Sequence, residues 1–230
     1  MIISAHQPAY LPWIGYFGKI ARSDAFVLHD RSRIGHGNML HRNKIDTTAG
    51  PMLLTVPLSR ADVRAELPLD EIRLVEDGWR RRHWKAIQMA YRRAPYFDRY
   101  AEFLASYYAG SYKTLDELCR PFIDYCLREL GLTTSMHTVS QLDLPAVDRD
   151  TIIPALCEAF GAARFLAGPL SVGYLDLDAL AERGIQIEVF EFVHPRYGQR
   201  HPDFRSHLSV LDLLMNCGPA SGDIVREESR

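Results

Sequence analysis

The chain has 230 residues, 47% of them hydrophobic and 24% charged, a composition typical of a globular protein with a sizeable core. Its net charge of -2, from 27 basic and 29 acidic residues, excludes a global field that would attract nucleic acid or an anionic membrane. No apolar run approaches the ~20 residues that span a bilayer, and the first residues lack the pattern of a secretory signal, so we expect a cytoplasmic protein with no membrane partner.

The first thirty residues predict a strand over 1–5, a helix over 13–21 and a second strand over 25–29. Two strands joined by a helical crossover lie parallel, and open α/β sheets bind ligands at the carboxyl edge. His6 and Gln7 follow the first strand. We therefore expect these two side chains on the ligand-binding edge.

The next part of the chain predicts a loop, a strand and then a helical insertion. A polar, glycine-containing segment over 32–43 is typical of an irregular loop, and 51–58 is strand-like. The insertion, about 77–131, holds helices predicted over 77–91, from about 95 to 108 and from about 115 to 130. The last helix has the capping-box pattern Thr114-x-x-Glu117.

Alternation of helices and strands then returns. The predicted elements are a helix over 150–160, a strand over 163–166, a helix over 176–183, a strand over 185–192 and a helix from about 208 to 216. We predict an α/β fold with a mainly parallel sheet, flanking helices and the helical insertion. It would form a single domain over 1–218, followed by a flexible C-terminal tail over 219–230.

Two groups of residues invite a metal hypothesis, and we expect no metal at either. The four cysteines, Cys119, Cys126, Cys157 and Cys217, are scattered in apolar segments, which favours buried thiols over metal ligands or disulfides. The histidines around Asp30, namely His29, His36 and His41, have no spacing that defines a coordination geometry. No cofactor is expected either.

The segment 6–17 has the most unusual composition. It combines a histidine, a glutamine, two prolines and four aromatic residues. Prolines reduce the conformational freedom of a loop, so His6, Gln7 and Tyr10 can be held in fixed positions for chemistry. A packed turn with a hydrogen-bonded histidine explains the composition equally well.

Three other features carry weaker signals. The basic segment 80–85, with Arg92 and Arg93, fits a phosphate site or, as we favour, a solvated helix face. Asp212 and Asn216 share one face of an apolar helix, where they either bond the backbone or approach a ligand. His194 and Tyr197 follow a predicted strand and can join the same carboxyl edge.

The pattern His6-Gln-Pro-x-Tyr-x-Pro-Trp-x-Gly-Tyr-Phe-x-Lys-Ile20, followed by a strand ending at Asp30, resembles the opening signature of WbqC-like proteins. Further segments agree in order and spacing, so the resemblance covers nearly the whole chain. They are Arg42-Asn-Lys-Ile45, Leu54-Thr-Val-Pro57, Trp79-x-x-x-His83, Ala94-Pro-Tyr-Phe97 and Leu208-Ser-Val-Leu-Asp-Leu-Leu-x-Asn-x-Gly218.

The resemblance implies a role in O-antigen polysaccharide or natural-product biosynthesis, with acyl or aminoacyl transfer from a small-molecule donor, a carrier protein or an aminoacyl-RNA to an amine acceptor. It implies catalytic roles for His6 and Gln7, with His6 as base and the Gln7 or Asn43 amide at the oxyanion. The other residues that match the motifs, as substrate-binding candidates, are Tyr10, Asp30, Asn43, Asp212 and Asn216. A Gly-x-Ser-x-Gly nucleophile motif is absent from the sequence, so direct attack by the amine is the simpler hypothesis.

Two alternatives stay open. The opening strand, loop and helix resemble those of nucleotidylyltransferases, although Tyr10-Leu-Pro-Trp13 stands where those enzymes have His-x-Gly-His. That likeness implies a nucleotide or nucleotide-sugar binding protein with a degenerate site. The other alternative is a non-catalytic scaffold in a biosynthetic complex.

Overall fold

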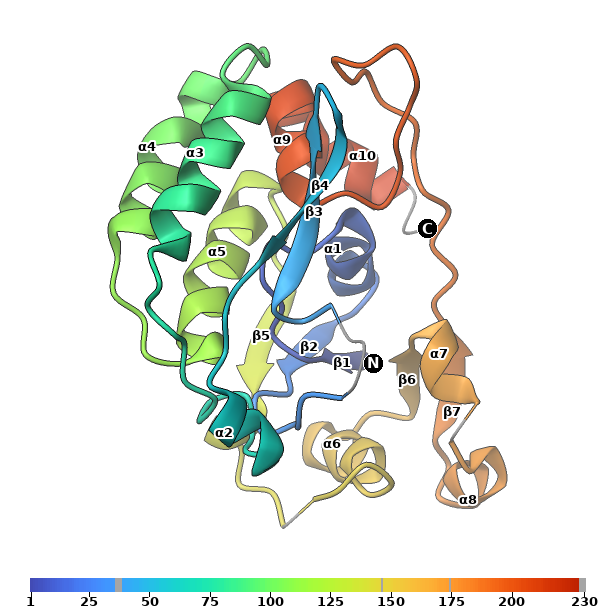
Figure 1. Ribbon diagram of the computed structural model, residues 1–230. Helices are drawn as coiled ribbons and strands as arrows, with labels where there is room; N and C mark the ends of the chain where they lie inside the picture. The colour runs from blue at the N-terminus through green and yellow to red at the C-terminus, as the bar shows by residue number, and fades with distance from the viewer. Residues whose placement is uncertain (36–38, 146, 174, 228–230) are drawn as a thin grey trace.

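The computed structural model describes residues 1–35, 39–145, 147–173 and 175–227. In this part of the chain, five strands form a parallel sheet in the order β5-β2-β1-β6-β7, flanked by helices (Figure 1). The strands are β1 (Ile2–His6), β2 (Ala25–Leu28), β5 (Ser135–Thr138), β6 (Arg164–Ala167) and β7 (Gln186–Val189). The predicted α/β class with a mainly parallel sheet is confirmed.

The strand order creates a switch point at the carboxyl ends of β1 and β6. After β1 the chain builds β2 and β5 on one side, and then β6 and β7 on the other. Open sheets of this kind bind ligands just beyond the strands at such a point. His6 ends β1 and Ala167 ends β6, so both lie at this position.

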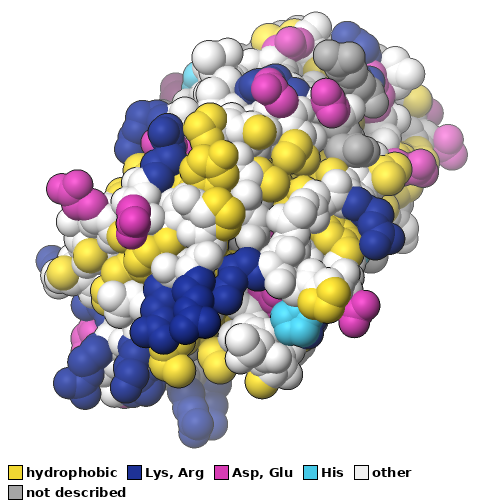
Figure 2. All heavy atoms as spheres, turned by 90° about the horizontal axis from the view of Figure 1, so that it is seen from above, with side chains coloured by type: hydrophobic (Ala, Val, Ile, Leu, Met, Phe, Trp, Pro, Cys, Tyr) yellow, Lys and Arg dark blue, Asp and Glu magenta, His cyan; other side chains and the backbone are white. Residues whose placement is uncertain are grey.

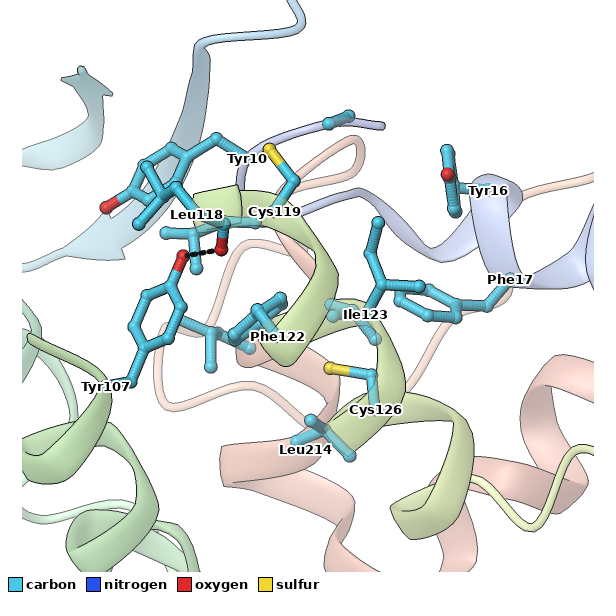
Figure 3. Packing of buried hydrophobic residues seen from close by; sticks show 14 of the residues in the cluster. Tyr10, Tyr16, Phe17, Tyr107, Leu118, Cys119, Phe122, Ile123, Cys126 and Leu214 are labelled. Atoms are coloured by element: carbon cyan, nitrogen blue, oxygen red, sulfur yellow. Dashed lines mark hydrogen bonds between the residues drawn. The ribbon is translucent and has the colours of Figure 1, made fainter. Parts of the chain in front are cut away.

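Helices cover both faces of the sheet, because the strands expose apolar side chains alternately on each face. Phe26 packs with the helices α1 (Ile14–Ala21), α5 (Leu115–Glu129) and α9 (Val210–Cys217). Val27 packs on the other face with α6 (Ile152–Phe160) and α8 (Leu177–Glu182). In Figure 3, Phe17 of α1 points toward Ile123 of α5. The cysteines are free thiols, and all except the half-buried Cys217 are buried.

Three helices occupy the predicted insertion, namely α3 (Trp79–Tyr91), α4 (Phe97–Ala109) and α5. The Thr114 hydroxyl accepts from the Glu117 amide at 3.3 Å, and the Glu117 carboxylate accepts from the Lys113 amide at 2.7 Å. This reciprocal capping starts α5 where the sequence pattern predicts. The remaining short helices are α2 (Arg60–Arg64), α7 (Pro169–Val172) and the 3-10 turns η1 (Val139–Gln141) and η2 (Gly218–Ala220).

Two strands were not predicted. The segment expected to be loop up to residue 43 enters strand β3 (Arg42–Thr47), which pairs antiparallel with β4 (Gly50–Thr55). The polar sequence of β3 lacks the apolar pattern that indicates a strand. Asn43 and Asp46 are buried all the same, because distant segments of the chain contact them. β5 was also missed, since it is short and polar and lies at a sheet edge. No helix in the described part of the chain has the length and apolarity needed to cross a membrane.

The flexible tail expected from residue 219 is instead helical over Ser221–Glu227, forming α10. Val225 is buried, and the Arg226 guanidinium donates to the Leu130 carbonyl at 2.8 Å. The sequence does not reveal this helix because it is short and packs mainly on α1, which is distant along the chain.

Candidate functional site

His6 is placed at the carboxyl end of the central strand, half-buried beside Tyr16 of α1. Its Nδ1 lies 3.0 Å from the Gln7 carbonyl oxygen, which can only accept, so Nδ1 carries the proton. Burial and the nearby Lys19 charge lower the pKa of His6 to about 4. The ring is therefore neutral at physiological pH, and its Nε2 has no hydrogen-bond partner among the described residues.

The main chain and the side chain of Gln7 differ in their hydrogen bonding. Its carbonyl accepts from His6 and, at 3.2 Å, from the Tyr16 hydroxyl. Its half-buried carboxamide has no partner within the described chain. The backbone is thus held in place, while the amide is available to a ligand.

Lys19 was not among the predicted site residues. It lies on the buried face of α1, and its Nζ donates to the Ala5 carbonyl at 2.9 Å. Burial lowers its pKa to about 8. The signal in the sequence was a single lysine within the otherwise apolar segment 14–21.

The first turn of α1 is covered by protein. A side chain on Gly15 would lie 2.3 Å from the Trp13 ring, so the indole occupies the space over this turn. Trp13 also pairs with Ser209 and stacks on His207 at 5.4 Å. In dinucleotide-binding folds this helix end holds a phosphate. Here an indole fills the space.

Asp30, at the end of β2, is 1% exposed and lies in an ionic network. Its carboxylate accepts from Arg120 at 3.0 Å and from the Ser140 amide and hydroxyl. Arg120 also bonds Asp116 and Thr138. Burial raises the pKa of Asp116. The network ties the carboxyl ends of β2 and β5 to α5.

Tyr10 and Asn43 point into the protein. The Tyr10 hydroxyl bonds His83 Nδ1 at 2.9 Å and the Tyr108 hydroxyl at 2.5 Å, and the residue has no exposed surface. The Asn43 amide donates to the Leu11 carbonyl at 2.6 Å and accepts from the Lys44 amide. Both fasten the segment after β1 to its neighbours.

The last group of predicted residues comes together around α9. The Asp212 carboxylate accepts from the Tyr197 hydroxyl at 2.9 Å, and the Asn216 amide donates to the Asp212 carbonyl at 2.7 Å. The ring centroids of His194 and Tyr197 lie 6.3 Å apart, and His194 also stacks on Trp13. Gln199, which was not predicted, donates to Asp212 at 2.8 Å.

Within the described residues, no group of His, Cys, Asp or Glu side chains has the arrangement of a metal site. Burial lowers the pKa of His29 and of His41, the latter to about 4. His36 lies outside the described residues. In the basic segment, Arg80 pairs with Glu76 at 2.6 Å and Arg82 with Asp77 at 2.9 Å.

A family model, described as the WbqC-like protein family, matches residues 7–224. The chain belongs to the WbqC-like family. This WbqC-like chain is also similar to an uncharacterized protein of Mycobacterium tuberculosis, with 29% identity over 222 residues that cover 96% of this chain and 95% of the relative. No solved structure matches it.

Proposed function

We propose that this WbqC-like protein transfers an acyl or aminoacyl group from an activated small-molecule donor to an amine acceptor, at the carboxyl end of β1. The observation that carries the proposal is the protonation and hydrogen bonding of the His6 ring. A neutral imidazole with its Nδ1 proton engaged presents Nε2 as a proton acceptor, which is what a general base requires.

In the proposed reaction, the amine nitrogen attacks the acyl carbonyl of a thioester or ester donor. A carbon–nitrogen bond forms, and the proton released by the amine passes to His6 Nε2. The bond from carbon to the leaving sulfur or oxygen then breaks, and His6 returns its proton to the leaving group. The Gln7 carboxamide donates to the carbonyl oxygen while that oxygen carries negative charge.

Nucleotide or nucleotide-sugar binding is the second candidate, and the strand order favours it. The order β5-β2-β1-β6-β7 has the same switch point as dinucleotide-binding sheets. The covering of the first turn of α1 by Trp13 weighs against it, because a phosphate would have to displace the indole. We therefore place this candidate below acyl transfer.

A ligand screen by thermal unfolding distinguishes the candidates. The probes are acetyl-CoA, aminoacyl thioesters, nucleotides and amino sugars. A ligand that binds only the folded state stabilises it by about 2.7 kcal/mol at a hundredfold excess over Kd. We expect stabilisation by a thioester in the wild type, its loss in Gln7→Ala, and its retention in Gln88→Ala, which removes an exposed glutamine of α3.

The transfer itself is measured as thiol release from the donor that binds, with and without an amino sugar. We expect release that depends on the acceptor and is lost in His6→Ala. Stabilisation by nucleotides alone would contradict acyl transfer and support the second candidate. Stabilisation by none of the probes would contradict both and favour a scaffold.

A further inference from the structure

A small cavity lies between the tip of the β3–β4 hairpin, the end of α3, and α9. Its volume is about 150 Å³, several times what one water needs and below the ~300 Å³ of drug-sized sites. A ligand of a few heavy atoms fits this space. The lining residues that carry the inference are Asp46, Tyr91, Arg200, His201, Asp212 and Asn216.

Asp212 is a buried carboxylate without a cation. It is 1% exposed, and its oxygens accept from Tyr91, Tyr197 and Gln199, which are all neutral donors. No ion pair involves it within the described chain. Burial raises its pKa. An isolated buried carboxylate is costly, and a positively charged group in the cavity would offset that cost.

Two further acceptors line the same cavity. Asp46 is 7% exposed, and Arg205 pairs with its Oδ1 at 2.5 Å, whereas Oδ2 has no partner among the described residues. The Asn216 amide nitrogen donates to the Asp212 carbonyl, which leaves Oδ1 of Asn216 open. Together with Asp212, these oxygens provide the acceptors that an ammonium group needs.

The cavity also presents donors. Arg200 is exposed and donates one bond, to the Ala90 carbonyl at 2.8 Å, which leaves the rest of its guanidinium free. His201 Nε2 lies 3.4 Å from Arg205 Nη2, so Nδ1 carries the proton, and this buried Nδ1 has no partner. Figure 2 views the end of the molecule where α9 and the hairpin tip lie, and shows Lys and Arg side chains gathered beside a histidine.

We propose that this cavity binds a small α-amino acid as its zwitterion, with the ammonium group against Asp212, Asp46 and Asn216 and the carboxylate against Arg200 and His201. The two kinds of lining group suit the two charges of such a ligand, and the volume restricts it to a small side chain. The inference does not rest on acyl transfer at His6, because neither His6 nor Gln7 lines the cavity.

The test is a calorimetric titration of the full chain with glycine and L-alanine, and with methylamine and acetate as probes of one charge each. We expect the amino acids to bind at least about tenfold more tightly than either single-charge probe, because two charge-assisted contacts act together. Absence of binding by both amino acids, or equal affinity for methylamine and glycine, would overturn the proposal.

Matched variants locate the contacts. Arg200→Met should weaken glycine about tenfold or more and leave methylamine unchanged, since it removes a donor to the carboxylate. Arg93→Met, which removes an exposed arginine that does not line the cavity, should bind glycine as the wild type does. Gln7→Ala should also retain glycine binding, which separates this site from the transfer site. Unchanged glycine affinity in Arg200→Met would contradict the assignment.

Discussion

Lys19 is a buried lysine whose positive charge affects its surroundings. It is 6% exposed, donates to the Ala5 carbonyl, and has no ion pair within the described part of the chain. Burial of a cation without a counter-charge disfavours the charged form. Its positive charge also contributes to the low pKa of His6. The lysine thus helps to keep the His6 ring neutral.

We predict that Lys19→Met abolishes a rise in stability between about pH 8 and pH 10.5. The folded pKa is about 8 and the ordinary value is 10.5. In this window the unfolded chain binds more protons, so the free energy of unfolding of the wild type increases with pH. The increase is on the order of 3 kcal/mol. Urea denaturation at pH 7 and pH 10 measures it in both proteins.

Removing the Lys19 charge should also raise the pKa of His6, which a histidine NMR titration follows. If the wild type and Lys19→Met gain the same stability from pH 7 to pH 10, Lys19 titrates normally. The gain in stability that both proteins show would then come from other titratable groups.

The sequence identifies site residues where chain order alone places them, and misses those that depend on distant contacts. His6 and Gln7 follow an apolar strand, so their position at the sheet edge is predictable. Tyr10 and Asn43 also belong to matching motifs, but contacts with His83 and Leu11 hold their side chains inside the protein. The hydrogen bond from the Gln199 side chain to Asp212 joins a loop to helix α9, and neither segment's own sequence indicates this contact.

At the scale of elements, apolar periodicity determined what could be predicted. Helix α1 and strand β2 lie within one residue of their predicted bounds, because their apolar residues form a continuous pattern. β3 and β5 are polar, and their pairing with β4 and β2 defines them as strands. Pairing between strands depends on segments outside a short window of sequence, so such a window does not predict it.

Helix α10 gives a prediction at this scale. A Cβ on Gly222 would lie 2.2 Å from the Leu130 carbonyl oxygen, so Gly222→Ala should force the helix off α5. We expect a loss of about 1–3 kcal/mol in the free energy of unfolding, measured by urea denaturation. Gly173→Ala is the control, because nothing lies within 4 Å of its Cβ position. Equal stability of the two variants would show that α10 does not dock there.

For the whole molecule, the sheet predicts a gradient of stability. β1 is paired on both sides, by β2 and β6, whereas β7 is an edge strand with Val189 43% exposed. In hydrogen exchange followed by mass spectrometry, we expect peptides from β1 and β2 to exchange most slowly and peptides from β7 to exchange earlier. Equal protection of β1 and β7 would indicate that the sheet opens only as one unit.

The position of β1 at the centre of the sheet also has a consequence for biosynthesis. β1 leaves the ribosome well before its partner β6, which begins at Arg164, and before α10, which packs on α1 and begins at Ser221. At ~5–20 residues per second, the nascent chain waits on the order of ten seconds or more before β1 is paired on both sides. During that time the apolar edge of β1 is exposed to chaperones and to other nascent chains.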